Sequence, residues 1–144
     1  MRVTHSAAHL EILGDEQCLE MLRRHAIGRI GLSSGALPVV VPVNYVLDGR
    51  TLLFRTEPGF KLDAARHGTV ACLEVDDVDV MAHTGSSVLA TGRLGVVTDE
   101  ARLHSSEHLP LRPWGAPGAR HLVELPIELL SGRRISVAGS PVAG

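Results

Sequence analysis

The residues best suited to hold a charged ligand gather in one short segment, Phe54 to Lys61 (FRTEPGFK). The segment follows an apolar run and precedes a helical pattern, which predicts a strand end, a turn at Pro58-Gly59 and a helix start. Backbone N–H groups at a helix start attract anions. Arg55 can donate two parallel hydrogen bonds to a phosphate, Thr56 can donate a third, and Lys61 adds a compact positive charge. The segment is therefore typical of a phosphate site.

The same residues allow a second interpretation, in which Arg55 and Lys61 are solvated charges that neutralise Glu57 and Asp63 on a surface helix. For an isolated strand-turn-helix this alternative is favoured. Lys61 is the only lysine among the 14 basic residues, a modest indication that a guanidinium does not serve there. The helices and strands expected around the segment are needed to choose between a phosphate site and solvated surface charges.

The elements before the segment are a helix and several strands. Residues Asp15 to His25 place apolar side chains at helical spacing, with Asp15 as the expected N-cap. Strands begin at Arg29, and a turn is expected at Ser34-Gly35. Asp48-Gly49 separates two apolar runs, as in a two-residue hairpin loop of type I′.

The elements after the segment continue this pattern. A helix from Phe60 ends at Gly68, strands are expected over 69–76 and 86–97, and a short polar helix follows over 98–108. Two final strands, 121–127 and 133–137, are expected around a turn at Ser131-Gly132. Hairpins outnumber helical crossovers, so we expect a mainly β fold with short helices (α+β), antiparallel and closed into a small barrel. A single domain over 1–138 and a frayed tail over 139–144 are predicted.

The composition argues against several classes of partner. The 144 residues are 44% hydrophobic and 21% charged, with a net charge of −2, so nucleic acid is not an expected partner. The longest apolar run, Leu37 to Val43, is far shorter than the roughly 20 residues of a membrane helix. A cytoplasmic location is expected. Cys18 and Cys72 have no metal-type spacing and are expected as buried thiols.

In order, the chain contains a short helix, GRIGL, PVVVPVNYVLDG, FRTEPGFKLDAA, ACLEVD, GSSVLATGRL and a loop with Trp, Pro and Gly. This order, above all VPVNY followed by the hairpin and FRTEPGFK, resembles the pyridoxamine 5′-phosphate oxidase-like, flavin-binding split-barrel family. The resemblance covers most of the chain and is strongest to small bacterial members related to nitroimidazole reductases. It implies an antiparallel split β-barrel like that of FMN-binding proteins, a homodimer, and one FMN in each of two interface clefts.

The resemblance also assigns residues by position. The phosphate grip falls on Arg55, Thr56 and Lys61, with Phe54 ending the preceding strand and Gly59 and Phe60 letting the backbone approach the phosphate. The flavin ring is expected along Val41, Pro42, Val43 and Asn44, where the Asn44 amide meets the polar edge of the ring. For any single valine, a place in the core remains the commoner outcome.

Two further positions are expected to line the cleft. Trp114 lies in a Pro- and Gly-rich loop and covers either the cofactor of a second subunit or the core of its own. Arg112 and Arg120 flank it as weak candidates for an anionic substrate. Relatives often have Trp where this chain has Gly85-Ser86-Ser87, so Ser87 predicts a more open cleft wall. The strand over 39–45 lacks the basic residues that hold pyridoxal phosphate in true oxidases, which argues against vitamin B6 oxidation.

Other patterns predict little chemistry. His104 and His108 are spaced i, i+4 without a third ligand, so no metal site is expected. The acidic residues of 74–79 are expected in a solvated turn. Catalytic residues are not identified. Three functions stay open: an FMN-dependent oxidoreductase, a reductase that uses the deazaflavin F420, and a non-catalytic flavin- or haem-binding module.

Overall fold

The computed structural model describes residues 9–111 and 121–137, which form ten strands and three short helices. In chain order the elements are β1 (His9–Ile12), α1 (Asp15–Arg24), β2 (Ile27–Ser34), β3 (Leu37–Asn44), β4 (Val46–Asp48), β5 (Thr51–Thr56), α2 (Phe60–Arg66), β6 (Val70–Asp79), β7 (Thr84–Arg93), β8 (Gly95–Val96), α3 (Glu100–Ser106), β9 (His121–Pro126) and β10 (Leu129–Ser136). The strand pairs between these elements are antiparallel. The prediction of a mainly antiparallel β fold with short helices is confirmed.

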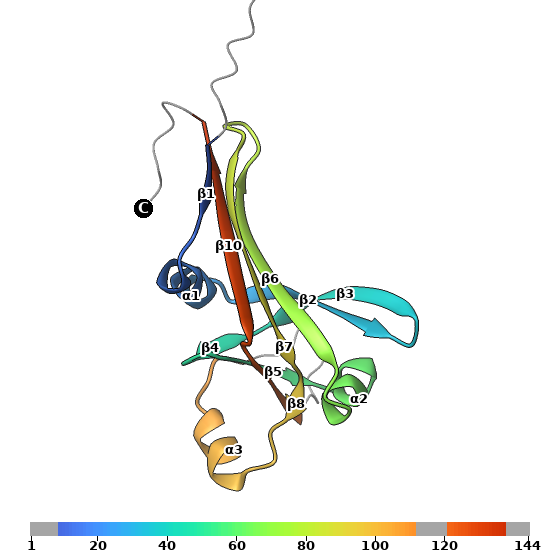
Figure 1. Ribbon diagram of the computed structural model, residues 1–144. Helices are drawn as coiled ribbons and strands as arrows, with labels where there is room; N and C mark the ends of the chain where they lie inside the picture. Colours follow the sequence, from blue (N-terminus) through green and yellow to red (C-terminus); the bar gives the residue numbers. More distant parts are fainter. Residues whose placement is uncertain (1–8, 112–120, 138–144) are drawn as a thin grey trace, which may run out of the picture.

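The strands form two sheets, one in the order β1-β10-β7-β6-β2-β3 and one in the order β4-β5-β9-β8. The chain passes from one sheet to the other at Tyr45, through α2 between β5 and β6, at Leu94 and at residues 127–128. Figure 1 shows the long strands β6, β7 and β10 running side by side, with the smaller sheet across one end and α2 beside it. The start of α2 therefore lies near the region where the two sheets meet.

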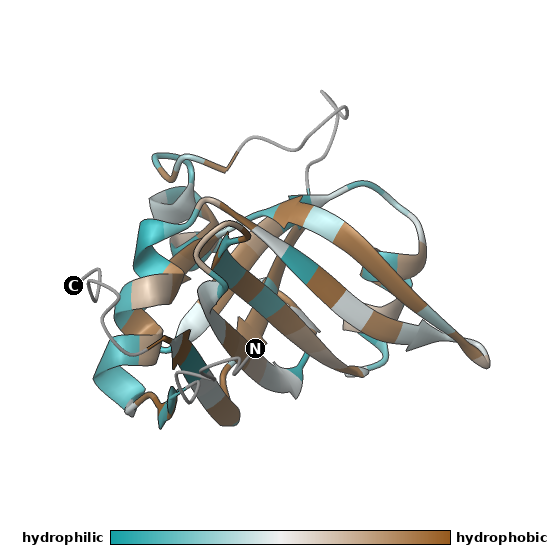
Figure 2. Ribbon diagram, turned by 90° about the horizontal axis from the view of Figure 1, so that it is seen from above, coloured by the Kyte–Doolittle hydropathy of each residue, from teal (hydrophilic) through white to brown (hydrophobic). Residues whose placement is uncertain are grey.

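The core between the sheets is mostly aliphatic, as the low aromatic content predicts. Ile30, Leu73 and Val88 of the large sheet and Leu52 and Leu125 of the small sheet are fully buried. Figure 2 shows hydrophobic and hydrophilic residues alternating along the strands, the pattern of a sheet that buries one face.

Both core aromatics with defined positions are fully enclosed. Phe54 is fully buried, and the buried hydroxyl of Tyr45 donates a 2.6 Å hydrogen bond to the Leu22 carbonyl of α1. Burial raises the pKa of the Tyr45 hydroxyl. Tyr45 thus fixes α1 against the point where the chain crosses between the sheets.

The two predicted hairpin turns exist with a shifted register. Asp48 pairs with Thr51, so the loop between β4 and β5 is Gly49-Arg50 rather than Asp48-Gly49. Only Gly49 of the two has a positive φ, at 63°, which fits glycine at the first loop position of a type II′ turn and not the expected type I′. Ser34 likewise pairs with Leu37, which leaves Gly35 and Ala36 as the other loop.

The expected turn at Ser131-Gly132 is wrong, because both residues lie inside β10. The turn is at Ile127-Glu128 instead. Gly132 serves close packing: a Cβ there would lie 2.6 Å from the Cys18 sulfur of α1. A glycine that looked like a turn residue is thus a contact point between a helix and a strand.

The acidic stretch is also placed differently from the expectation. It belongs to β6, which stays paired with β7 as far as Asp79, so it is not a solvated turn. Two smaller corrections concern the N-terminal part. Gly14, not Asp15, is the N-cap of α1. The strand β1, which pairs with β10, is not predicted from the sequence.

Candidate functional site

The predicted phosphate segment forms a tight connection between the end of β5 and the start of α2. Arg55 and Lys61 are half-buried at its two ends, and Thr56 is only 4% exposed. The helix has seven residues, so its dipole is small and the side chains carry most of the positive charge. The structure brings Arg55, Thr56, Gly59, Phe60 and Lys61 together as predicted from the sequence.

Lys61 is the most perturbed basic group of this turn. Burial lowers the pKa of its ammonium, and the negative charge of Glu57 opposes that shift. Its Nζ lies 6.0 Å from the centre of the Phe60 ring, at the limit of a cation–π contact. The ammonium is therefore partly stripped of water without a close ion pair among the described residues, a state in which a phosphate would be a favourable partner.

Arg55 makes a contact that the sequence did not predict. Its Nη2 donates a 3.1 Å hydrogen bond to the backbone carbonyl of Ser106, the last residue of α3. A guanidinium has five N–H donors, so the others stay available to a ligand. Ser106 is 51 positions away in the sequence, and no local pattern relates it to the turn.

Thr56 and Gly59 differ from the expected roles in detail. The Thr56 hydroxyl donates to the neighbouring Glu57 carbonyl at 3.1 Å, which shapes the turn and occupies its only proton. Gly59 has an extended φ of 160°, and a Cβ built there meets nothing within 4 Å. The space beside Gly59 is thus open to a ligand rather than filled by the chain.

The four predicted residues of β3 divide between the two faces of the strand. Val43 is buried in the core and Val41 packs against it, whereas Pro42 and Asn44 alternate to the other face. The commoner outcome for a valine, a place in the core, therefore holds for both. Phe54, from the neighbouring sheet, also has its side chain in the core.

Asn44 carries the one anomaly of this strand. Its Oδ1 is buried and has no hydrogen-bond partner among the described residues, where it is the single such side-chain atom. A buried acceptor without a donor costs about 1–3 kcal/mol, so such atoms are rare and call for a partner. The polar edge of a flavin ring carries an N–H donor, and this oxygen fits such a group.

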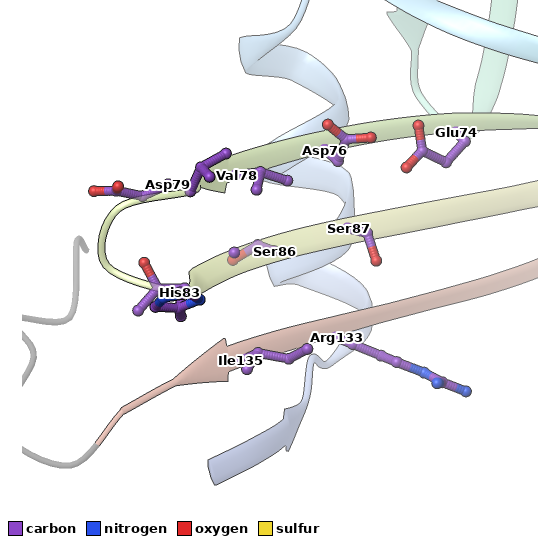
Figure 3. Close-up of a pocket in the computed structure, with 12 residues that line it drawn as sticks. Glu74, Asp76, Val78, Asp79, His83, Ser86, Ser87, Arg133 and Ile135 are labelled. Atoms are coloured by element: carbon purple, nitrogen blue, oxygen red, sulfur yellow. The ribbon is translucent and has the colours of Figure 1, made fainter. Parts of the chain in front are cut away.

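Ser87 lies in a different part of the chain, in a cleft of about 640 Å³ between the β6–β7 hairpin and β10. Figure 3 shows Glu74, Asp76, Ser87 and Arg133 along the strands that line it. Asp76 faces Ser87 in the register and lies six residues beyond the start of β6, which adjoins α2. At 3.4 Å per residue that is about 20 Å. One chain does not bring Ser87 to the phosphate turn.

The charged side chains that line this cleft are Glu74, Asp76 and Asp79 of β6 and Arg133 of β10. Two of the acids also contact an arginine of β2. Arg29 Nη1 lies 3.3 Å from Glu74 Oε1 and 3.2 Å from Asp76 Oδ2. Burial raises the pKa of Glu74, the adjacent Asp76 raises it further, and Arg29 opposes both. These residues are a charge cluster on the outer face of the large sheet, which the sequence pattern did not reveal.

Several predicted features fall elsewhere. Trp114, Arg112 and Arg120 and the tail over 139–144 lie outside the described residues. No group of three or more His, Cys, Asp or Glu side chains in ranges 9–111 and 121–137 could hold a metal ion. His104 is exposed and lies 3.6 Å from Glu107. The described part of the chain contains no helix long and apolar enough to cross a membrane.

Two solved structures with this arrangement are described as FAD-binding proteins. The FAD-binding protein from Mycobacterium smegmatis is 34% identical, with a TM-score of 0.71 over 85% of this chain and 96% of that chain. An FAD-binding protein from Mesorhizobium loti has a TM-score of 0.75 at 22% identity, over 90% of this chain and 99% of that chain. The fold is thus confirmed as the split β-barrel that the resemblance implied.

Sequence comparison gives the same relationship. An uncharacterized Mycobacterium tuberculosis protein, Rv0080, is 32% identical over 136 residues, which cover 90% of this chain and 88% of that protein. The sequence profile of the family described as pyridoxamine 5′-phosphate oxidase matches residues 14–134. This match takes in the whole of β3, the phosphate turn and α2. The chain therefore belongs to the pyridoxamine 5′-phosphate oxidase-like family.

Proposed function

We propose that this protein binds a flavin nucleotide, with the phosphate at Arg55 and Lys61 and the ring along β3, and that it acts as a flavin-dependent oxidoreductase. The observation that carries the proposal is the buried Oδ1 of Asn44, which lacks a donor in the described part of the chain. A flavin supplies that donor at its ring and an anion for Lys61 at its phosphate. FMN and FAD share both features.

The residues of the site have binding roles rather than acid or base roles. Arg55, fixed by its bond to Ser106, holds a pre-oriented guanidinium at the turn. Asn44 orients the ring edge, and the apolar strand beside it limits water. The flavin itself, when bound, supplies hydride or electron transfer. The strand over 39–45 has no basic residue for pyridoxal phosphate, which supports a substrate other than vitamin B6.

The proposal includes a homodimer formed through the outer face of the large sheet. Strand register puts nine exposed aliphatic residues on that face: Leu10, Ile12, Ile27, Val40, Val70, Val78, Leu89, Leu129 and Ile135. Monomeric proteins rarely expose so continuous an apolar surface. The face also carries the acids Glu74 and Asp76 on β6 and an exposed Arg133 on β10. Opposite charges on one face suit a two-fold pairing.

A homodimer would also explain why the cleft at Ser87 and the phosphate turn lie apart within one chain. The cleft at Ser87 lies about 20 Å along β6 from the start of that strand, which adjoins α2. A second copy packed on the outer face would bring its own cleft wall to the ring of the first. Each flavin site would then use both subunits.

The test is titration of the purified protein with FMN, FAD and F420, followed by flavin fluorescence and calorimetry. We expect saturable binding of FMN or FAD with about one cofactor per chain. Absence of saturable flavin binding would reject the proposal, and tighter binding of F420 would replace it with the deazaflavin alternative. A tightly bound flavin that neither NAD(P)H nor reduced F420 can reduce would instead indicate a carrier.

A further inference from the structure

A second cavity adjoins the phosphate turn and is not used by the site described above. It has a volume of about 280 Å³ and lies between the β2–β3 turn and α2. Figure 1 shows the β2–β3 hairpin extending on the same side of the molecule as α2. Gly59 and Phe60 belong both to the phosphate turn and to the wall of this groove. The groove therefore continues from the place where the phosphate would lie.

The size of the groove suits part of a ligand. Pockets for whole small molecules span about 300–1,000 Å³. This groove is slightly smaller than that range, and it opens beside Gly59, where an added Cβ would meet nothing within 4 Å. A ligand that already occupies the phosphate turn could therefore extend into it past Gly59 without displacing the chain.

The lining of the groove suits a nucleoside better than an acidic chain. Leu32 and Ala64 are buried beneath it, and Ser34 and Thr69 contribute hydroxyl groups. Its titratable side chains are Asp63 and His67, and no lysine or arginine lines it. A carboxylate hydrogen-bonds ribose hydroxyls, as in dinucleotide-binding folds, but it repels an anionic tail.

His67 adds a fixed flat ring to this wall. Its Nδ1 lies 2.7 Å from the Asp63 carbonyl oxygen. Because a carbonyl only accepts, Nδ1 carries the proton and the bond holds the ring at the end of α2. Histidine rings stack on unpaired bases in nucleotide-binding proteins. A hydroxyl-lined groove with a carboxylate and a held ring is thus suited to adenosine.

We propose that the groove between the β2–β3 turn and α2 binds the adenosine end of FAD, which makes FAD rather than FMN the preferred cofactor. This inference rests on the proposed flavin site and adds the identity of the dinucleotide to it. It does not depend on the cleft at Ser87. FMN ends at the phosphate and cannot reach the groove.

The experiment compares the dissociation constants of FAD and FMN, measured by calorimetry, for the parent chain and for two pairs of variants. Ser34→Trp fills the groove, and Ala36→Trp places the same bulk on an exposed residue of the same turn that does not line it. His67→Ala removes the ring, and Arg66→Ala alters the adjacent exposed residue outside the groove. Circular dichroism and thermal melts confirm folding.

We expect the parent to bind FAD about tenfold or more tightly than FMN, a margin of roughly 1.4 kcal/mol. Ser34→Trp should abolish this margin, with FMN binding within about twofold of the parent, and His67→Ala should reduce it. The two control variants should keep it. Equal affinities in the parent, or a margin that survives Ser34→Trp, would overturn the groove assignment while leaving the flavin site intact.

The remaining outcomes separate the two proposals. Absence of any flavin binding would overturn both. Equal loss of FAD and FMN in folded Ser34→Trp would show that the groove is not selective for adenosine and would also overturn the assignment. Tighter binding of F420 than of FAD, lost in Ser34→Trp, would assign the groove to an acidic tail instead.

Discussion

Two side chains of the candidate site are held at an energetic cost in the isolated chain. The Oδ1 of Asn44 is buried without a donor among the described residues, and the ammonium of Lys61 is partly desolvated by burial. A flavin nucleotide would relieve both, because its ring offers a donor and its phosphate offers a negative charge. Costs of this kind are typical of residues kept for binding rather than for stability.

Replacement of Asn44 by leucine separates the effect of this residue on stability from its effect on flavin binding. Asn44→Leu removes the unpaired acceptor at similar size, so we expect the cofactor-free protein to gain up to about 1–3 kcal/mol of unfolding free energy. Flavin affinity should fall about tenfold with the loss of one hydrogen bond. Denaturant unfolding and calorimetry measure the two effects. A less stable variant with parent affinity would make Asn44 a structural residue.

The charge of Lys61 should matter only for a ligand that carries a phosphate. Lys61→Met keeps an unbranched side chain only one atom shorter and removes its charge, so FMN binding should weaken about tenfold or more, as expected for a lost charged hydrogen bond. Riboflavin has no phosphate and should bind the variant and the parent equally. Fluorescence titration with both ligands measures this difference. An equal loss for both ligands would place Lys61 outside a phosphate site.

The titration of Lys61 sets the direction in which folding stability and FMN affinity change with pH. Because the folded pKa of Lys61 is lowered from its usual 10.5, the unfolded chain binds more protons between the two values. The stability of the cofactor-free parent should therefore rise with pH in that window, and FMN affinity should fall there as Lys61 loses its charge. Unfolding and binding measured against pH should show neither trend in Lys61→Met. The same trends in that variant would assign them to other groups.

At the scale of elements, the site depends on a contact between segments that are distant in sequence. Arg55 ends β5, and its guanidinium donates to the carbonyl of Ser106 at the end of α3. Asp99 caps the other end of α3 by accepting from the Arg102 N–H. The helix is therefore tied at both ends, once within itself and once to the phosphate turn.

Removal of this tie should loosen α3 selectively. Arg55→Met loses one charged hydrogen bond, worth about 1–2 kcal/mol, so amide exchange over 100–106 should accelerate about tenfold. Exchange in α1 should not change. Arg50→Met, at an exposed arginine that contacts Asp15, is the matched control and should leave α3 unchanged. Unaltered exchange of α3 in Arg55→Met would mean that the contact does not hold the helix.

At the scale of the whole molecule, the large sheet buries only one of its two faces. The inner face packs on the smaller sheet and α1, while the outer face keeps aliphatic residues exposed beside the cluster of Arg29, Glu74 and Asp76. Burial of this face against a second copy would remove apolar surface from water and oppose charges of both signs. A stable interface needs about 800 Å² from each partner.

A charge placed in the middle of the outer face tests the homodimer. Leu89 is 40% exposed and lies between Glu74 and Ser131 in the register, so Leu89→Lys should convert a dimer to a monomer and weaken flavin binding. Leu37, 70% exposed at the start of β3, alternates to the other face, and Leu37→Lys should stay dimeric. Sedimentation or light scattering measures the mass. A monomeric parent, or a dimeric Leu89→Lys, would contradict this interface.

The sequence by itself determined the elements whose signals are local. The helices at 15–24 and 60–66, the hairpins and the phosphate turn follow from neighbouring residues, since apolar spacing, caps and turn residues act over a few positions. The grouping of Arg55, Thr56 and Lys61 was predicted for the same reason. The loop between β4 and β5 is Gly49-Arg50 rather than Asp48-Gly49 because the pairing of the two strands sets which residues form the loop.

Only the tertiary structure decided what depends on distant contacts. The same glycine type marks a turn at Gly49 and a close approach to Cys18 at Gly132, and only packing separates the two. The tie between Arg55 and Ser106, the unpaired oxygen of Asn44 and the distance between Ser87 and the phosphate turn likewise depend on how the two sheets meet. No local pattern encodes such relations, because burial and hydrogen-bond partners are set by chain segments far apart in sequence.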